Sequence, residues 1–382
     1  MIQILVLSRL GFAGLLQRKG SSLVLVGSVG CVVGVLLAML SVTEGMLRAS
    51  RIGSDARSAI VLSPFNNEYG TGIPANVIGT ILDAPGIARG PDGHPLGDAE
   101  VVFWVPPTGP YVVGSPNVRG IGAAGLALRP NLRIVSGRQF RWGGEEVVVG
   151  VAAARAYGLR VGDKVTLPQG AWPIVGSFTD DGSFLESQLL GDAATLLAAG
   201  HLSGFGSVLI RLERAEAFGA FEHWLRNNPA LTVNPERQLD YELRTVNRAS
   251  AFFTELTYLV GVIMALGALF GVVKLTYATV SVRARELATL RAIGYQPSAV
   301  AVSVLLETMV LSVLGAVLGA GTAWLLFNAR QVAALQSVFA LSVSPFLFGL
   351  GLAWALALAI LGGLAPAIRA ARLPVADALR AL

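Results

Sequence analysis

Charged side chains are scarce in this sequence of 382 residues, because Asp, Glu, Lys and Arg together make up 14% of it, whereas about a quarter is usual in a soluble domain. Hydrophobic residues make up 53%, and the mean hydropathy is +0.63. Cysteine is nearly absent too, since Cys31 is the only one. The composition excludes an ordinary soluble protein and indicates a membrane protein. Any domain outside the cytoplasm must be stable without an internal disulfide.

Sequence motifs for nucleotide binding, metal binding and catalysis are missing as well. The sequence holds no G-x-x-x-x-G-K-[ST] phosphate loop, so the chain cannot cradle a nucleotide in the usual way. The three histidines, His94, His201 and His223, are too scattered to argue for a metal site, and no Ser/His/Asp constellation can be assigned from spacing. We therefore expect neither catalysis by the chain itself nor a cofactor or metal bound to it.

Long apolar runs, in contrast, are present, and four of them reach the ~20 residues needed to cross a bilayer. They predict transmembrane helices at residues 23–43, 252–281, 298–328 and 345–366. A signal peptide is the alternative for the first run. Its apolar core exceeds the roughly 7–15 residues of a signal peptide, and no small-x-small cleavage site follows cleanly, so we expect the run to remain as a membrane helix.

Basic residues gather at the ends of these runs and account for the net charge of +5. The clusters are Arg9, Arg18 and Lys19; Arg283, Arg285 and Arg291; and Arg369, Arg372 and Arg380. Lys and Arg are retained on the cytoplasmic side, which places the N-terminal segment (1–22), the connection 282–297 and the C-terminal tail (367–382) in the cytoplasm. Residues 44–251 and the loop 329–344 then lie outside. Membrane topology explains the charge better than phosphate binding, so no nucleic-acid partner is expected.

Residues 44–251 differ from the rest in being turn-rich and mixed in polarity. Short strands bounded by turn residues are predicted at 59–62, 100–105, 146–149, 164–167, 172–176 and 207–210. Helices are expected at 151–157, 192–199 and 215–227, and loops at 86–97 and 106–116. The pattern predicts an α+β domain between the first and second spans.

Two charges and three glycine pairs stand inside the spans. Counted along ideal helices, Lys274 and Glu307 lie ~13 and ~15 Å above the ends of their spans. An unpaired charge in a membrane costs roughly 2.5–3.5 kcal/mol, so we predict an ion pair between them, either structural or holding the two spans in register as they move. The small-x-x-x-small pairs permit close helix approach within one protomer or in a dimer; they are Gly30/Gly34, Gly267/Gly271 and Gly315/Gly319.

The connection between the second and third spans is the most informative stretch. Over residues 283–294 it reads RARELATLRAIG, and Leu287, Leu290 and Ile293 recur at helical spacing. Its arginines alone fit a solvated turn. The full string, however, resembles the coupling helix of FtsX/MacB-type ABC transporter permeases, whose pattern is R-x-R-E-[ILV]-x-x-L-R-A-[ILV]-G. Residues 134–140, 146–150, 158–163, 172–178 and 366–380 resemble further stretches of this family.

The resemblance implies a permease subunit of the mechanotransmission type (type VII) in the inner, cytoplasmic membrane, with four transmembrane helices and a MacB-like periplasmic core domain. A separate ABC ATPase dimer would bind ATP and Mg. The residues implied in coupling to it are Arg283, Arg285, Glu286, Leu287, Leu290, Arg291 and Gly294. Among these, Arg285 and Glu286 would make polar contacts with the ATPase, while Leu287 and Leu290 would fill its groove.

Further partners follow from the same resemblance. Family members of this size work as dimers, so a second copy of the chain is expected, besides membrane lipids. A periplasmic membrane-fusion adaptor and an outer-membrane channel would join in a tripartite exporter. The chain would export or extract a lipid, lipoprotein, peptide or drug. Two alternatives stay open: a transmembrane regulator that activates an extracytoplasmic hydrolase or signalling partner, and, ranked below it, a membrane-anchored enzyme with its active site in the outer domain.

Overall fold

The structure is a computed structural model that describes residues 19–64, 67–69, 71–104, 116–167, 170–334 and 337–372. The outer parts of both predicted tails (1–18 and 373–382) and nearly all of the predicted loop 106–116 lie outside the described residues. The chain divides into two compact units. One, the helical unit, comprises Met1–Glu44, Ala251–Asn328 and Ser342–Leu382, and the other, the sheet domain, comprises Gly45–Ser250 and Ala329–Leu341.

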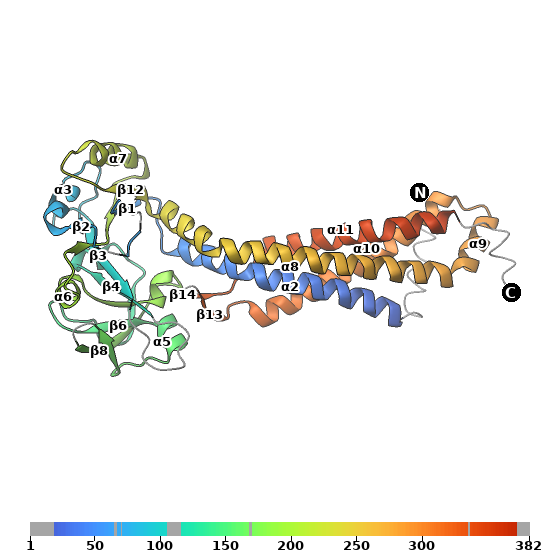
Figure 1. The fold of residues 1–382 in the computed structure, drawn as a ribbon, viewed down its shortest axis with the longest axis horizontal. Helices are drawn as coiled ribbons and strands as arrows, with labels where there is room; N and C mark the ends of the chain where they lie inside the picture. Colours follow the sequence, from blue (N-terminus) through green and yellow to red (C-terminus); the bar gives the residue numbers. More distant parts are fainter. Residues whose placement is uncertain are drawn as a thin grey trace. The chain divides into compact units, whose positions relative to one another are not determined.

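Four helices are long and apolar enough to cross a membrane, and Figure 1 shows them running beside one another. They are α2 (Lys19–Ile52), α8 (Gln238–Val282), α10 (Pro297–Phe327) and α11 (Pro345–Ala371). Proline stands in the first turn of both α10 and α11, where its missing N–H costs nothing. The Ser344 hydroxyl caps α11 by accepting a hydrogen bond from the Leu347 amide. The four predicted spans are confirmed as helices.

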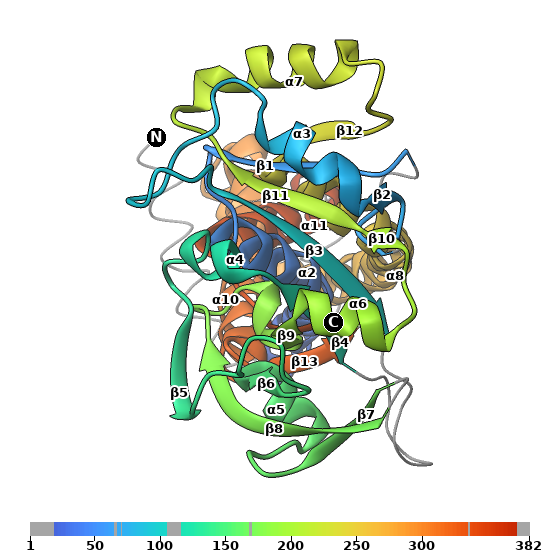
Figure 2. The ribbon, with the colours of Figure 1, turned by 90° about the vertical axis from the view of Figure 1, so that its left-hand side faces the viewer.

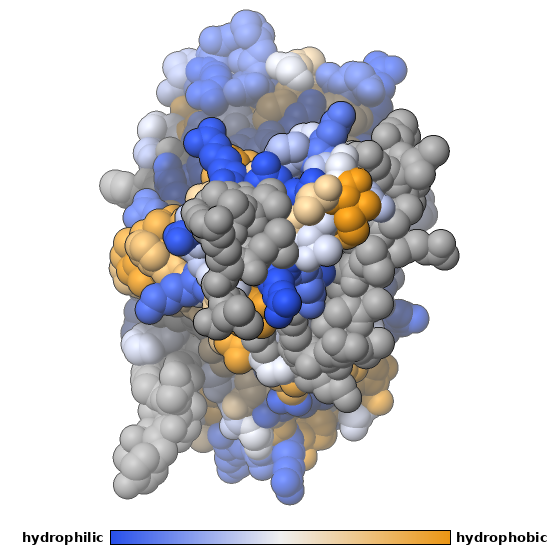
Figure 3. All heavy atoms as spheres, turned by 90° about the vertical axis from the view of Figure 1, so that its right-hand side faces the viewer, coloured by the Kyte–Doolittle hydropathy of each residue, from blue (hydrophilic) through white to orange (hydrophobic). Residues whose placement is uncertain are grey.

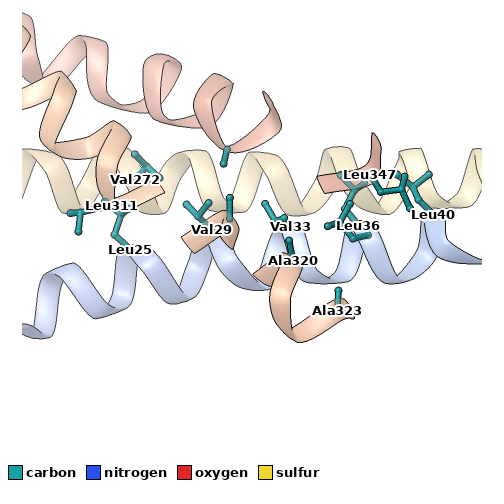
Figure 4. Close-up of a cluster of buried hydrophobic side chains, with 13 residues drawn as sticks. Leu25, Val29, Val33, Leu36, Leu40, Val272, Leu311, Ala320, Ala323 and Leu347 are labelled. Atoms are coloured by element: carbon teal, nitrogen blue, oxygen red, sulfur yellow. The ribbon is translucent and has the colours of Figure 1, made fainter. Parts of the chain in front are cut away.

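The four helices share one apolar core. In Figure 4, Val33 of α2, Val272 of α8, Leu311 of α10 and Leu347 of α11 belong to the same buried cluster. Helix α2 supplies the most residues to the cluster and lines it from Leu25 to Leu40, whereas α10 supplies four residues, α11 two and α8 one. The first span is therefore the central packing element of the helical unit.

Glycine allows α2 and α10 to approach each other closely. A Cβ on Gly30 would lie 2.9 Å from the carbonyl oxygen of Gly315, and one on Gly319 would collide with the carbonyl of Gly30. Two of the three predicted glycine pairs are thus used inside the protomer. The third is different, since a Cβ on Gly267 or Gly271 of α8 would meet nothing within 4 Å.

The sheet domain is built on a ten-stranded mixed sheet, seen in Figure 2, with the strand order β12-β1-β11-β3-β4-β9-β6-β8-β5 and β7 beside β8. Most neighbours are antiparallel, but β4 with β9 and β6 with β8 are parallel. The strands are β1 (Ser58–Leu62), β3 (Gly97–Trp104), β4 (Asn117–Ile121), β5 (Arg133–Gly137), β6 (Val147–Gly150), β7 (Lys164–Leu167), β8 (Gly170–Thr179), β9 (Leu189–Asp192), β11 (Ser207–Arg211) and β12 (Asn234–Arg237).

Short helices and two small two-stranded sheets complete this domain. The helices are α3 (Ile78–Leu82), α4 (Ala123–Ala127), α5 (Val151–Tyr157), α6 (Ala193–Ala199) and α7 (Phe218–Asn227), with 3-10 turns η1 (Ala75–Val77), η2 (Phe184–Ser187) and η3 (Ala215–Ala217). Strand β2 (Ile73–Pro74) pairs with β10 (Gly204–Phe205), and β13 (Gln331–Ala334) pairs with β14 (Ser337–Ala340). One core surrounds Trp172 and another surrounds Phe221, and both side chains are fully buried.

The predicted α+β fold class is confirmed, with the domain between the first two long helices. All six predicted strands and all three predicted helices occur within a few residues of their expected bounds. Strands β2, β4, β5, β9, β10 and β12 and helices α3 and α4 were missed, as was the β13–β14 pair in the predicted loop 329–344. That pair belongs to the sheet domain, where Phe339 of β14 packs edge-on against Phe184 of η2 at a ring distance of 6.2 Å.

Candidate functional site

The connection between the second and third spans folds as a short helix, α9 (Ala284–Ala292). It begins directly after α8, with Arg283 in between, and the Leu287 amide donates to the Arg283 carbonyl. It ends at Ala292, and Gly294, two residues further on, has a φ of +105°, a conformation that residues with a side chain rarely adopt. The glycine of the coupling pattern therefore has a backbone role, since it turns the chain from α9 towards Pro297 of α10.

One face of α9 packs into the helical unit. Leu287 is 5% exposed and joins a buried cluster with Val280 of α8, Val304 of α10 and Ala370 of α11, and Leu290 packs against that cluster. The prediction that Leu287 fills a groove of the ATPase is therefore not supported by this structure, because its side chain is already enclosed. Sequence spacing identified the apolar stripe but gave no indication of which neighbour it faces.

The opposite face of α9 is open. Arg285, Glu286 and Thr289 are exposed, and Ile293 at the end of the helix is 72% exposed. Figure 3 looks onto the end of the helical unit that carries α9 and shows hydrophilic and hydrophobic side chains next to one another. We call Arg285, Glu286, Thr289 and Ile293 the α9 outer face. Residues 286, 289 and 293 follow helical spacing, which makes Ile293, not Leu287, the apolar centre of this face.

Arg283 faces the helical unit. Its guanidinium Nη1 donates to the Glu307 carboxylate of α10 at 2.6 Å, and its Nε lies 3.3 Å from the Glu286 carboxylate. The side chains of Arg283 and Glu307 are 12% and 11% exposed. A small cavity of about 30 Å³ lies beside the pair. Arg283 thus connects α9 to the third span, which is a different role from direct contact with an ATPase.

The predicted Lys274–Glu307 pair is replaced by this Arg283–Glu307 pair. Lys274 is an exposed residue of α8, and no ion pair involving it occurs among the described residues. Lys274 does not reach Glu307 because it lies on a different face of α8 from Arg283. Nine residues separate Lys274 from Arg283, which is about two and a half turns, so the two side chains leave the helix on opposite sides. The prediction considered the depth of each residue in the span but not its face.

Comparisons with known proteins identify this region. Residues 258–375 match the family of the FtsX-like permease C-terminal domain. This part of the chain is an FtsX-like permease C-terminal domain. The match runs from α8 through α9 and α10 to the end of α11 and so contains the whole α9 outer face. The predicted family is confirmed over this part of the chain, and the FtsX-like permease family is one of transporter membrane subunits.

The other two comparisons add less. A solved structure, the extracellular domain of the noncanonic ABC-type transporter YknZ from Gram-positive bacteria, is similar to 47% of this chain and 99% of its own length, at 11% identity and a TM-score of 0.36. No curated protein matches the sequence.

Proposed function

We propose that this FtsX-like permease receives ATP-driven movement from a separate ABC ATPase dimer at its α9 outer face and transmits it to the sheet domain. The observation that carries the proposal is the position of α9. It follows α8 directly, and α8 is one continuous helix of 45 residues that begins at Gln238 in the sheet domain. At 1.5 Å per residue this helix is about 68 Å long, so a displacement at one end reaches the other without an intervening loop.

Buried contacts support transmission through the rest of the helical unit. Leu287 and the Arg283–Glu307 pair attach α9 to α10 and α11. Packed interiors pass on displacement because they are close to incompressible. A partner that pushes on Ile293 and Glu286 therefore moves several spans together. ATP and Mg bind to the ATPase in this proposal, and the chain itself holds no cofactor.

The topology of the proposal follows from the basic clusters. Both termini and α9 are cytoplasmic, and the sheet domain lies outside the inner membrane. A second copy of the chain packs on the open side of α8, where Gly267 and Gly271 meet nothing in the protomer. The substrate is a lipid, lipoprotein, peptide or drug, handed to a periplasmic adaptor and an outer-membrane channel.

Substitutions on the α9 outer face test the coupling. We expect Ile293→Asp and Glu286→Lys to abolish co-purification of the ATPase and the stimulated ATP hydrolysis, because burying an apolar side chain of this size contributes about 1.5–3 kcal/mol to an interface. The matched control is Val161→Asp, which changes an exposed branched residue of the sheet domain. Membrane insertion and protease resistance should be unchanged in all three variants. Full ATPase binding by both α9 variants would overturn the proposal.

Cysteine labelling tests the topology. In a Cys31→Ser background, Glu216→Cys should react with a membrane-impermeant maleimide in cells whose outer membrane has been permeabilised. Thr289→Cys on the α9 outer face should react only after lysis. The reverse pattern would contradict the proposed orientation. Two further measurements distinguish a regulator from a transporter. Deletion of a regulator leaves export unchanged, and the sheet domain of the intact regulator binds a hydrolase or signalling partner.

A further inference from the structure

The sheet domain contains a cavity of about 670 Å³ whose lining residues all belong to that domain. Its walls come from the ends of α2 and α8, from strands of the central sheet and from the η2 turn. Pockets of roughly 300–1,000 Å³ are typical for drug-sized ligands. The coupling proposed above makes no use of this space, and its size suits a small organic molecule.

One wall of the cavity is a network of ion pairs in which the arginines of the lining are bound to carboxylates. Arg119 donates to Glu100 at 2.6 Å and to Glu68 at 2.7 Å, and Arg129 lies 2.7 Å from the other oxygen of Glu100. The third arginine of the lining, Arg211, contacts Asp55 at 2.9 Å. Each positive charge that faces the cavity is therefore held by a carboxylate. An anionic ligand would have to displace one of these carboxylates.

Two further carboxylates of the lining have no such partner. Asp180 is 7% exposed and accepts a hydrogen bond from the Ser183 hydroxyl, while Glu242 accepts one from the Gln238 side chain at 2.8 Å. Neither makes an ion pair within the part of the chain that the structure describes. Burial raises the pKa of Asp180, although Ser183 and the charge of Arg129 oppose this. Desolvated carboxylates without a counter-charge favour a positively charged ligand.

The remaining wall is apolar. Met46, Ala49 and Ile52 come from the end of α2, and Val246 and Ala249 come from the start of α8. Phe184 and Leu185 of η2 also line the cavity. A purely hydrophilic cation would leave this wall in contact with water, whereas a ligand with an apolar body would bury it. The cavity thus combines an excess of carboxylates with a hydrophobic surface.

We propose that this cavity binds an amphipathic organic cation, whose positive group pairs with Asp180 and Glu242 and whose apolar body lies against the ends of α2 and α8. The proposal goes beyond the coupling function and does not depend on it. The excess of negative over positive side chains in the lining favours a cationic ligand. The lining holds five carboxylates, Asp55, Glu68, Glu100, Asp180 and Glu242, and three arginines, Arg119, Arg129 and Arg211.

Direct binding of rhodamine 6G, a lipophilic fluorescent cation, to the full chain in lipid nanodiscs tests the proposal. We expect saturable binding above the partition into empty nanodiscs, and a loss of affinity of about tenfold or more in the double variant Asp180→Asn with Glu242→Gln. The matched control is Asp181→Asn, which removes an exposed carboxylate next to Asp180 in sequence and should leave the affinity unchanged. The anionic dye 1-anilinonaphthalene-8-sulfonate should not compete.

A steric variant separates binding from folding. Ala249→Trp places a large side chain at the cavity wall and should block rhodamine binding, whereas Asn247→Trp, at an exposed position two residues away, should not. Limited proteolysis confirms that each variant is folded. The coupling variant Ile293→Asp should bind rhodamine normally, so failure of the coupling proposal and failure of this one are distinguishable. Equal binding by the wild type, the cavity variants and empty nanodiscs would overturn the proposal, as would competition by the anionic dye.

Discussion

Helices α2 and α10 of the helical unit meet through glycine backbone atoms, whereas strands β3 and β4 of the sheet domain are joined by a buried arginine between glutamates. In the first case Gly30 and Gly319 come together because neither has a side chain. In the second, Arg119 fixes Glu100 and Glu68, and its Nε donates to Gln188 at 2.8 Å. The packing of α2 against α10 therefore depends on the absence of side chains at the contact. The packing of β3 and β4 depends on the pairing of buried charges.

The difference explains which of these two kinds of contact can be read from the sequence. Glycines four residues apart and a charged string between two spans are local patterns, and the charged string and the Gly315/Gly319 pair lie within residues 258–375, which match the family. The ion-pair network joins Glu68, Glu100, Arg119 and Arg129. No local pattern connects positions so far apart in the chain, so only the folded structure shows them together.

The largest effect is expected from breaking the charge balance. Arg119→Met leaves Glu68 without its partner and Glu100 with only Arg129, and removal of one member of a buried pair costs about 3–5 kcal/mol. The sheet domain should unfold at a lower temperature in thermal scans followed by limited proteolysis, while the helical unit stays inserted. The control is Arg133→Ala, which breaks the exposed pair with Asp181 and should cost at most about 1 kcal/mol. Equal losses in the two variants would contradict the comparison.

A smaller effect is expected from filling the glycine contact. Gly319→Leu forces α2 and α10 apart, and overpacking of this kind costs about 1–3 kcal/mol. Gly321→Ala, two residues further along α10, is the matched control because its Cβ would meet nothing within 4 Å. We expect Gly319→Leu alone to lower the thermal stability of the helical unit in detergent. A destabilised sheet domain with an unchanged helical unit would be the opposite of this expectation.

The smallest effect concerns a buried carboxylate next to the network. Burial, together with the charge of Glu100, raises the pKa of Asp98 to about 7, and both Asp98 oxygens accept the Gly122 amide. The folded domain holds this proton more tightly than the unfolded chain does, so the contribution is full at acid pH and is lost as the pH rises towards 7. Asp98→Asn should flatten the decline of the unfolding temperature between pH 5 and 8, by about 2–4 °C for each kcal/mol. Identical pH profiles would show that Asp98 does not titrate in this range.

The candidate site illustrates what sequence can and cannot decide. The string at 283–294 predicted the position of α9 between two spans, and the structure places α9 at Ala284–Ala292. The sequence did not predict that Leu287 is buried against the helical unit while Ile293 is exposed, because both belong to one apolar stripe at helical spacing. It also missed β4, since Arg119 and Gly120 interrupt the apolar alternation that identifies a strand. Tertiary neighbours, not local pattern, settle such questions.

The β13–β14 pair has a consequence for the order in which the protein is made. It packs within the sheet domain, where Val338 and Phe339 are buried, although it is encoded between α10 and α11. During synthesis the domain that begins at Gly45 therefore waits for strands that emerge only after the third span. Until then, the surface around Phe184 lacks its partner ring. The sheet domain can be completed only after three of the four spans have been translated, so its folding depends on synthesis of most of the helical unit.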